Sequence, residues 1–119
     1  MATKRGHTFT DNCEEEMIQL YTDGGARGNP GEAAYGFLIY DNGEELCKEG
    51  KKLGNTTNNV AEYKAIIEGL RKCLGIDDSV EVFSDSELIV KQLNGEYKVK
   101  KEHLKALYCV VKDLEKRFK

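Results

Sequence analysis

The stretch MIQLYTDGGARGNPGEAAYGFLIY, residues 17–40, contains the features that decide the fold. Its first part, residues 17–23, predicts a β-strand that ends at Asp23, and residues 33–40 predict a second strand. The segment between them holds four glycines, an arginine and the only proline of the chain. We expect a loop at residues 24–31, because so many glycines let a backbone approach another molecule closely. Asp23 therefore stands at the start of a loop suited to close contact.

The remaining elements follow from turn signals and hydrophobic spacing. Asn42-Gly43 is typical of a tight hairpin and predicts a third strand at about residues 44–53. A helical stripe then begins at Asn58, after Thr56 and Thr57 as possible caps and before Gly75 as a stop. The stripe consists of Tyr63, Ile66, Ile67, Leu70 and Leu74. Further along we expect a strand at residues 79–85, a short helix through Leu93 that breaks at Asn94-Gly95, and a last helix from about Lys101.

The expected strand directions bring three acidic residues to one end of the sheet. Two hairpins reverse the chain twice after Asp23, so the long helix starts at the same end, with Glu62 in its first turn. A right-handed crossover returns the fourth strand parallel to the first, and this strand ends at Asp85. The predicted fold is α/β, with a mixed sheet of strand order 3-2-1-4 flanked by helices. Open sheets of this kind bind ligands at the carboxyl ends of their strands.

Three converging carboxylates either raise one another's pKa or bind a cation. Oxygen ligands suit hard divalent ions such as Mg²⁺ or Mn²⁺. Each acid also has an ordinary structural role: Asp23 as a turn residue, Glu62 as a glutamate favoured by the helix dipole, and Asp85 as a helix cap. Each such role is the commoner one for a single acid. Together the three acids predict a metal site.

Composition places the chain among intracellular globular proteins. Its 119 residues suffice for one domain, which we expect at residues 17–119 after a polar lead at residues 1–16. No run approaches the roughly 18 apolar residues of a membrane span, and the lead lacks the apolar core of a signal peptide. We therefore expect a cytoplasmic protein without a membrane partner. The cysteines are far apart and predict reduced thiols; they are Cys13, Cys47, Cys73 and Cys109.

Charge is unevenly distributed along the chain. The net charge is −3, yet residues 88–119 hold nine basic and four acidic residues. A basic segment of this kind is either a phosphate-binding surface or a solvated helix face. The two isolated histidines, His7 and His103, are expected at the surface. The lysines in question are Lys98, Lys100, Lys101 and Lys105.

Three segments carry a resemblance to a known family. They are YTDGGARGNPG at residues 21–31, NTTNNVAEYKAIIEGL at residues 55–70 and VFSDSELIVKQLNGEYKVK at residues 82–100. In this order and spacing they resemble the three motifs of the type 1 ribonuclease H family, over nearly the whole chain from Met17. The combination is specific, because a lone Asp-Gly or Asp-Ser pair occurs in many proteins.

The resemblance implies hydrolysis of the RNA strand of RNA–DNA hybrids, leaving 3′-hydroxyl and 5′-phosphate ends. Two divalent ions, Mg²⁺ or Mn²⁺, would lie about 4 Å apart, one activating a water and the other stabilising the leaving 3′ oxygen. By similarity Asp23 would bridge both ions, and Glu62 and Asp85 would hold the ion at the leaving group.

The same resemblance assigns residues to the substrate. The loop, including Gly24 and Gly28, would lie in the shallow minor groove, where 2′-hydroxyl groups distinguish RNA from DNA. Other matched positions are Asn29, Thr57, Asn58, Asn59, Glu62, Ser86 and Glu87, with Thr57 and Asn59 at a phosphate of the DNA strand. Asn29-Pro30-Gly31 is equally typical of a turn, and Asn58 and Asn59 of a helix cap. Some relatives also carry a basic substrate-binding element where the four lysines fall.

The chain departs from the family pattern at its end. In the family a fifth strand, a loop often bearing a histidine, and a last helix that opens with a fourth aspartate follow, whereas this sequence ends at LEKRFK. No other acid replaces that aspartate convincingly; those considered are Asp11, Glu14, Glu15, Glu16, Asp113 and Glu115. We therefore expect a truncated, weakly active or inactive enzyme, whose exposed fourth strand favours dimerisation or strand exchange.

Two alternatives belong to other functional classes. One is a natural short form that binds RNA–DNA hybrids or RNA without cleaving them. The other is an actin-like phosphotransferase, which also places an aspartate-glycine loop after its first strand. Such an enzyme needs a second lobe, and 119 residues do not supply one.

Overall fold

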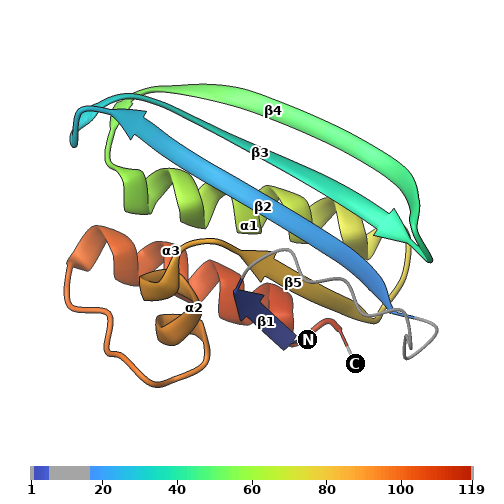
Figure 1. Cartoon of the computed structure of the whole chain (residues 1–119). Coiled ribbons are helices and arrows are strands. Elements are labelled where there is room, and N and C mark those ends of the chain that lie inside the picture. The colour runs from blue at the N-terminus through green and yellow to red at the C-terminus, as the bar shows by residue number, and fades with distance from the viewer. Residues whose placement is uncertain (1, 6–16, 119) are drawn as a thin grey trace.

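The computed structural model describes residues 2–5, as backbone, and residues 17–118. In chain order the elements are β1 (Ala2–Arg5), β2 (Ile18–Arg27), β3 (Gly31–Asp41), β4 (Glu44–Thr56), α1 (Asn58–Leu74), β5 (Val80–Ser84), α2 (Glu87–Leu93) and α3 (Glu102–Glu115) (Figure 1). The residues considered above that lie outside the described part are His7, Asp11, Cys13 and Glu14–Glu16.

The strands form one mixed sheet in the order β1-β5-β2-β3-β4. β2, β3 and β4 are antiparallel neighbours, and β5 is parallel to β2. Asn42 and Gly43, between β3 and β4, have φ angles of 54° and 85°, as a tight hairpin turn requires. The predicted order of the four long strands is therefore confirmed.

β1 adds a fifth strand at the edge of the sheet. Its backbone pairs in parallel with β5, from Ala2 opposite Glu81 to Arg5 opposite Ser84. The expectation that β5 is an exposed edge, with residues 1–16 as a lead outside the domain, is wrong for these four residues. Strand pairing uses backbone hydrogen bonds, and a four-residue segment is too short to show a side-chain period.

β2 and β3 are longer than predicted. Their pairing continues as far as Arg27 opposite Glu32, so the expected loop at residues 24–31 is reduced to a turn at residues 28–30. Glycine is rare in strand interiors, and for this reason the sequence pattern ended the strand at Asp23. The continuous ladder with β3 overrides that local preference.

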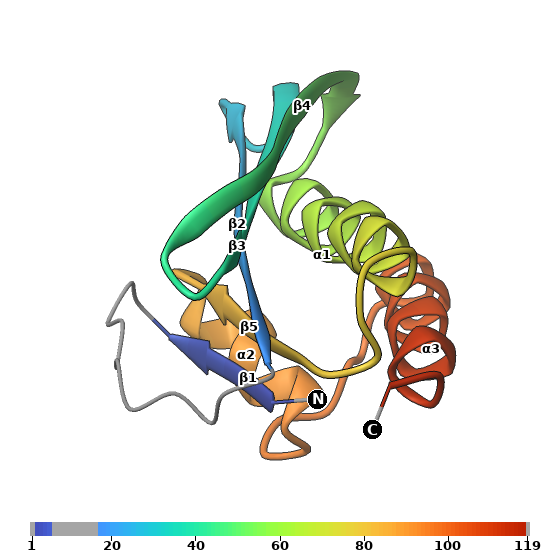
Figure 2. The ribbon, with the colours of Figure 1, turned by 90° about the vertical axis from the view of Figure 1, so that its right-hand side faces the viewer.

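The core lies between the sheet and the helices, and α1 and α3 are on the same side of the sheet (Figure 2). Thr57 caps α1 through a hydrogen bond from the Val60 N–H, and Gly75 follows its last turn, as predicted. Burying a large apolar side chain contributes about 1.5–3 kcal/mol. The predicted stripe is buried except for the partly buried Leu74. The strand residues that join this core include Ile18, Leu20, Val80 and Val82.

The cysteines and the helix lengths can also be compared with what the sequence predicted. Cys47, Cys73 and Cys109 are free thiols. In the part of the chain that the structure describes, every helix is too short or too polar to cross a membrane.

Candidate active site

The three predicted acids come from three different elements. Asp23 is on β2, Asp85 directly follows β5, and Glu62 is on α1. β2 and β5 are parallel, with Thr22 opposite Ser84. Because Asp23 and Asp85 are the next residues after this pair, which is the last of the β2–β5 ladder, both acids lie at the same end of that ladder, as predicted.

Gly24 brings β2 into direct contact with α1. A Cβ atom on Gly24 would lie 2.5 Å from the carbonyl carbon of Ala61 and 2.7 Å from the backbone nitrogen of Glu62. Only glycine permits this approach. α1 begins at Asn58, so Glu62 lies just past the first turn instead of within it. The contact at Gly24 therefore places Glu62 beside Asp23, and the helix dipole is not the main reason for an acid there.

Glu62 is in an environment that disfavours its charge. Its pKa is raised to about 7, first by burial and then by the carboxylates of Asp23 and Asp85, although a hydrogen bond from the Gly24 N–H acts in the opposite direction. Its Oε1 atom is buried and has no hydrogen-bond partner among the described residues. An unsatisfied buried oxygen costs free energy. A bound cation would satisfy this oxygen and lower the pKa.

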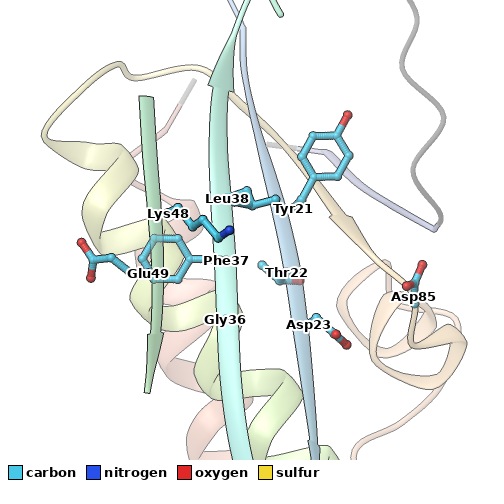
Figure 3. A pocket seen from close by; sticks show the side chains of 9 residues that line it. All are labelled: Tyr21, Thr22, Asp23, Gly36, Phe37, Leu38, Lys48, Glu49 and Asp85. Carbon is cyan, nitrogen blue, oxygen red and sulfur yellow. The ribbon is translucent and has the colours of Figure 1, made fainter. Parts of the chain in front are cut away.

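Asp23 and Asp85 line a cavity of about 310 Å³ that also reaches β3 and β4. Figure 3 shows the Asp23 side chain extending from β2 toward the turn that carries Asp85, while the Asp85 carboxylate points away from Asp23. Within residues 17–118, no three His, Cys, Asp or Glu side chains are grouped as ready ligands for one ion. The acids are thus near enough to shift the pKa of Glu62 without forming a ready-made set of ligands in residues 17–118.

A second group of predicted residues fixes the end of the β2–β3 hairpin to the start of α1. The Ala26 N–H donates to Asn58 Oδ1 over 2.7 Å, and the Asn58 N–H donates to Asn29 Oδ1 over 3.0 Å. These two bonds join segments about thirty residues apart in sequence. Asn29 lies in the turn at residues 28–30, the alternative that the sequence left open for it. Asn58 is the first residue of α1 and not its cap, which is Thr57; the Asn58 side chain instead bonds to the hairpin. The side chains of Asn29 and Asn58 use only their Oδ1 atoms in these two hydrogen bonds.

Ser86 and Glu87 lie at the start of α2, directly after Asp85. The Ile89 N–H donates to Ser86 Oγ over 3.3 Å, so Ser86 is the cap of the helix, a role that the sequence suggested for Asp85. Glu87 forms an ion pair of 3.0 Å with Lys91. The two residues are beside the acids because the chain turns directly from β5 into α2.

A model of the RNase H family matches residues 15–119. The chain belongs to the RNase H family. Sequence relatives with this assignment include ribonuclease HI of Halobacterium salinarum, which is 43% identical over 81 residues, covering 66% of this chain and 40% of that protein. The bifunctional protein Rv2228c of Mycobacterium tuberculosis is 39% identical over 106 residues. This chain spans only 29% of its length.

Solved structures of the RNase H family have the same fold. LC11-RNase H1, in complex with an RNA/DNA hybrid, superposes with a TM-score of 0.80 at 44% identity, over 85% of this chain and 78% of that one. The N-terminal RNase H domain of rv2228c from Mycobacterium tuberculosis gives a TM-score of 0.83 at 36% identity, over 86% of this chain and 76% of that one.

Asn59 and the four lysines of the predicted basic element do not all lie at one site in this RNase H chain. Asn59 lines a groove of about 490 Å³ together with Lys98, Lys100 and Lys101. Lys105 instead pairs with Glu102 over 3.2 Å. Three of the four lysines of the predicted basic element thus gather beside a predicted phosphate contact.

Two buried hydroxyl groups near the acids were missed by reasoning from the sequence. Thr22 and Ser84 are 1% and 0% exposed, and each directly precedes an acid, Asp23 or Asp85. The available signal was a hydroxyl residue on an otherwise apolar strand face, at the same position in both strands.

Proposed function

We propose that this chain is a metal-dependent ribonuclease that hydrolyses the RNA strand of RNA–DNA hybrids and leaves 3′-hydroxyl and 5′-phosphate ends. The observation that carries the proposal is Glu62, whose pKa is raised by burial and two neighbouring acids and whose Oε1 has no partner in the described part. Groups perturbed in this way are concentrated at functional sites. Family membership, and the similarity to an RNase H1 solved with an RNA/DNA hybrid, support the substrate.

The acids of this chain fit divalent metal ions, which the family generally uses. Every donor is a carboxylate oxygen, the type that Mg²⁺ and Mn²⁺ prefer. Asp23, Glu62 and Asp85 would hold two ions, and the bound ions would supply an activated water and neutralise charge on the leaving 3′ oxygen. Asp23 and Asp85 are exposed, so their carboxylates can turn toward a cation without unpacking the core.

The hairpin end supplies donors for the substrate. The Oδ1 atoms of Asn29 and Asn58 accept backbone hydrogen bonds, which leaves their amide NH₂ groups as donors for a ligand. Amide NH₂ groups can donate to 2′-hydroxyl oxygens in the minor groove of a hybrid. Thr57 accepts a hydrogen bond as the α1 cap, and its hydroxyl can still donate to a phosphate. We assign the DNA-strand phosphate to Thr57 and Asn59.

A hybrid-binding module without cleavage is the second candidate. The observation that favours it is that no three His, Cys, Asp or Glu side chains in residues 17–118 are grouped to hold one ion. A pure binding module gains nothing from a carboxylate whose charge is disfavoured, and this argues for the nuclease. The two candidates differ in whether metal ions are required for a chemical change in the RNA.

The test uses a hybrid with end-labelled RNA and its DNA complement. The chain is incubated with Mg²⁺, with Mn²⁺ and with a chelator, and the products are separated and examined for 3′-hydroxyl ends. Matched substrates are the same sequence as duplex DNA and as duplex RNA. Asp23→Asn is the inactive control, and Asp41→Asn, at an exposed aspartate at the end of β3, is its matched control.

The nuclease predicts cleavage of the hybrid alone, dependent on divalent ions, abolished in Asp23→Asn and kept in Asp41→Asn. Binding of the hybrid that weakens with salt, without cleavage under any metal condition, would establish the binding module instead. The rate in the wild-type chain also measures how far three carboxylates suffice for the reaction.

A further inference from the structure

Two buried hydroxyl groups form a matched pair under the candidate site. Thr22 of β2 lies directly opposite Ser84 of β5, and this is the last pair of the parallel ladder. Both side chains are buried, at 1% and 0% exposed. The next residue after each is an exposed acid, Asp23 or Asp85. The pair therefore lies between the apolar core and the acids.

Packing alone does not explain hydroxyl groups at these positions. The preceding pairs of the ladder on the same face of the sheet are Ile18 with Val80 and Leu20 with Val82, all four apolar and at most 1% exposed. Valine has nearly the same shape as threonine, and a buried hydroxyl costs free energy unless it is hydrogen-bonded. A further apolar pair would therefore serve the core at least as well.

Each hydroxyl makes a hydrogen bond that constrains an acid. Thr22 Oγ1 donates to the backbone oxygen of Phe83 over 3.1 Å, which connects β2 to β5 just before both strands reach their acids. Ser84 Oγ accepts from the Ser86 N–H over 3.2 Å, a bond that spans Asp85. The first bond adds a side-chain link to the backbone ladder at the end that carries the acids, and the second spans the turn that carries Asp85.

We propose that Thr22 and Ser84 are positioning residues, which hold Asp23 and Asp85 at the separation needed to bind divalent ions. The inference rests on the proposed function, because it assumes that these acids bind ions. Neither hydroxyl contacts an ion or the substrate in this role; each acts through the backbone that carries an acid. Groups that orient metal ligands typically change metal affinity by about 10–100-fold when they are removed.

The test measures divalent-ion affinity without any substrate. Mn²⁺ is titrated by calorimetry into the wild-type chain, Thr22→Val, Thr22→Ser and Ser84→Ala. Ile18→Val is the matched control, because it trims a buried side chain at the opposite end of the same ladder. Urea unfolding of each variant first confirms that the chain is folded at the titration temperature.

We expect the dissociation constant for Mn²⁺ to rise about tenfold in Thr22→Val and in Ser84→Ala. Thr22→Ser should bind Mn²⁺ like the wild type, because it keeps the hydroxyl. Ile18→Val should also bind normally, even if it unfolds at a lower urea concentration. Cleavage by Thr22→Val, where the wild type cleaves, should be restored by raising the metal concentration.

The inference is overturned if Thr22→Val and Ser84→Ala bind Mn²⁺ as the wild type does, or if Ile18→Val weakens binding equally. If Thr22→Val does not fold, Ser84→Ala alone decides. Failure of the proposed function has a different signature: the wild-type chain leaves the hybrid uncut, whatever the order of the Mn²⁺ affinities. A wild-type chain that binds no Mn²⁺ contradicts both.

Discussion

The two ends of the β2–β5 pair have opposite physical characters. At the amino ends, Ile18 and Val80 lie opposite each other and are 1% and 0% exposed. Just beyond the last pair of the ladder, Asp23 and Asp85 are exposed carboxylates, and together with burial, which is the larger cause, they raise the pKa of Glu62. One short ladder thus joins a packed core to charges that repel one another. The apolar end therefore supplies the stability that holds the acids in place.

Asp23→Asn should have the largest effect of the changes considered, because it should affect cleavage strongly and stability very little. Removing one metal ligand and its charge should lower hybrid cleavage by about 1,000-fold, since ligated ions supply several kcal/mol of transition-state stabilisation. Stability without metal should stay the same or rise slightly, because repulsion of Glu62 is relieved. Single-turnover cleavage and urea unfolding measure the two effects. A variant that keeps more than a tenth of the wild-type rate would exclude Asp23 as a ligand.

Gly24→Ala tests the contact that joins the core to the acids. The added Cβ would meet the backbone of Ala61 at 2.5 Å, and overpacking of this severity should cost about 3 kcal/mol of unfolding free energy. Gly25→Ala is the matched control, because its Cβ would meet nothing closer than Asn58 Oδ1 at 3.8 Å. Urea unfolding compares the two. Equal losses would mean that the contact with α1 is not what makes glycine necessary at position 24.

Glu62→Gln tests how much the charge of Glu62, next to Asp23 and Asp85, lowers the free energy of unfolding. The folded-state pKa of Glu62 is about 7, above its ordinary value of 4.5. Between these pH values the folded chain binds more protons than the unfolded chain, so without metal the stability falls as pH rises. Because Glu62 is partly exposed, we discount the full shift and expect Glu62→Gln to be about 2 kcal/mol more stable than wild type at pH 8. At pH 4.5 the two should be nearly equal.

Urea unfolding at several pH values, with a chelator present, measures this difference. Glu68→Gln, which removes a more exposed carboxylate of α1 paired with Arg71, should change stability by less than about 1 kcal/mol at every pH. Mg²⁺ should then stabilise the wild type at pH 8 more than Glu62→Gln. A pH dependence that is unchanged by Glu62→Gln would show that Glu62 is ionised normally in the folded chain.

The hairpin turn and the long helix were predictable from the sequence because their signals are local. The Asn42-Gly43 turn, the helical stripe of α1 and its Thr57 cap each rest on residue types with strong preferences. The meeting of the three acids followed from strand direction and the handedness of the crossover. These parts of the fold and the site could be predicted without knowing any distance between atoms.

The parts that could not be predicted depend on backbone contacts. β2 continues through Gly24 and Gly25 because it is paired with β3, although glycine disfavours strands. The close approach of Gly24 to Ala61 is a distance between backbones that no local pattern encodes. The role of Thr22 depends in the same way on a carbonyl group of the neighbouring strand.

Deleting residues 2–5 should lower the stability only slightly, and it leaves both ends of the β2–β5 pair unchanged in sequence. β1 gains backbone hydrogen bonds with β5, but ordering a terminal segment offsets most of that gain, so we expect a loss of about 1 kcal/mol or less. The larger consequence should be self-association, because the β5 backbone becomes an edge that can pair with a second copy. Sedimentation velocity over a range of concentrations, with the full chain at the same concentrations, measures it. The opposite result would be a deletion variant that stays monomeric but binds Mn²⁺ more weakly. In that case β1 does not protect an edge of the sheet. It instead helps to hold Ser84, which lies opposite Arg5 in the ladder, and so supports the end of the sheet that carries the acids.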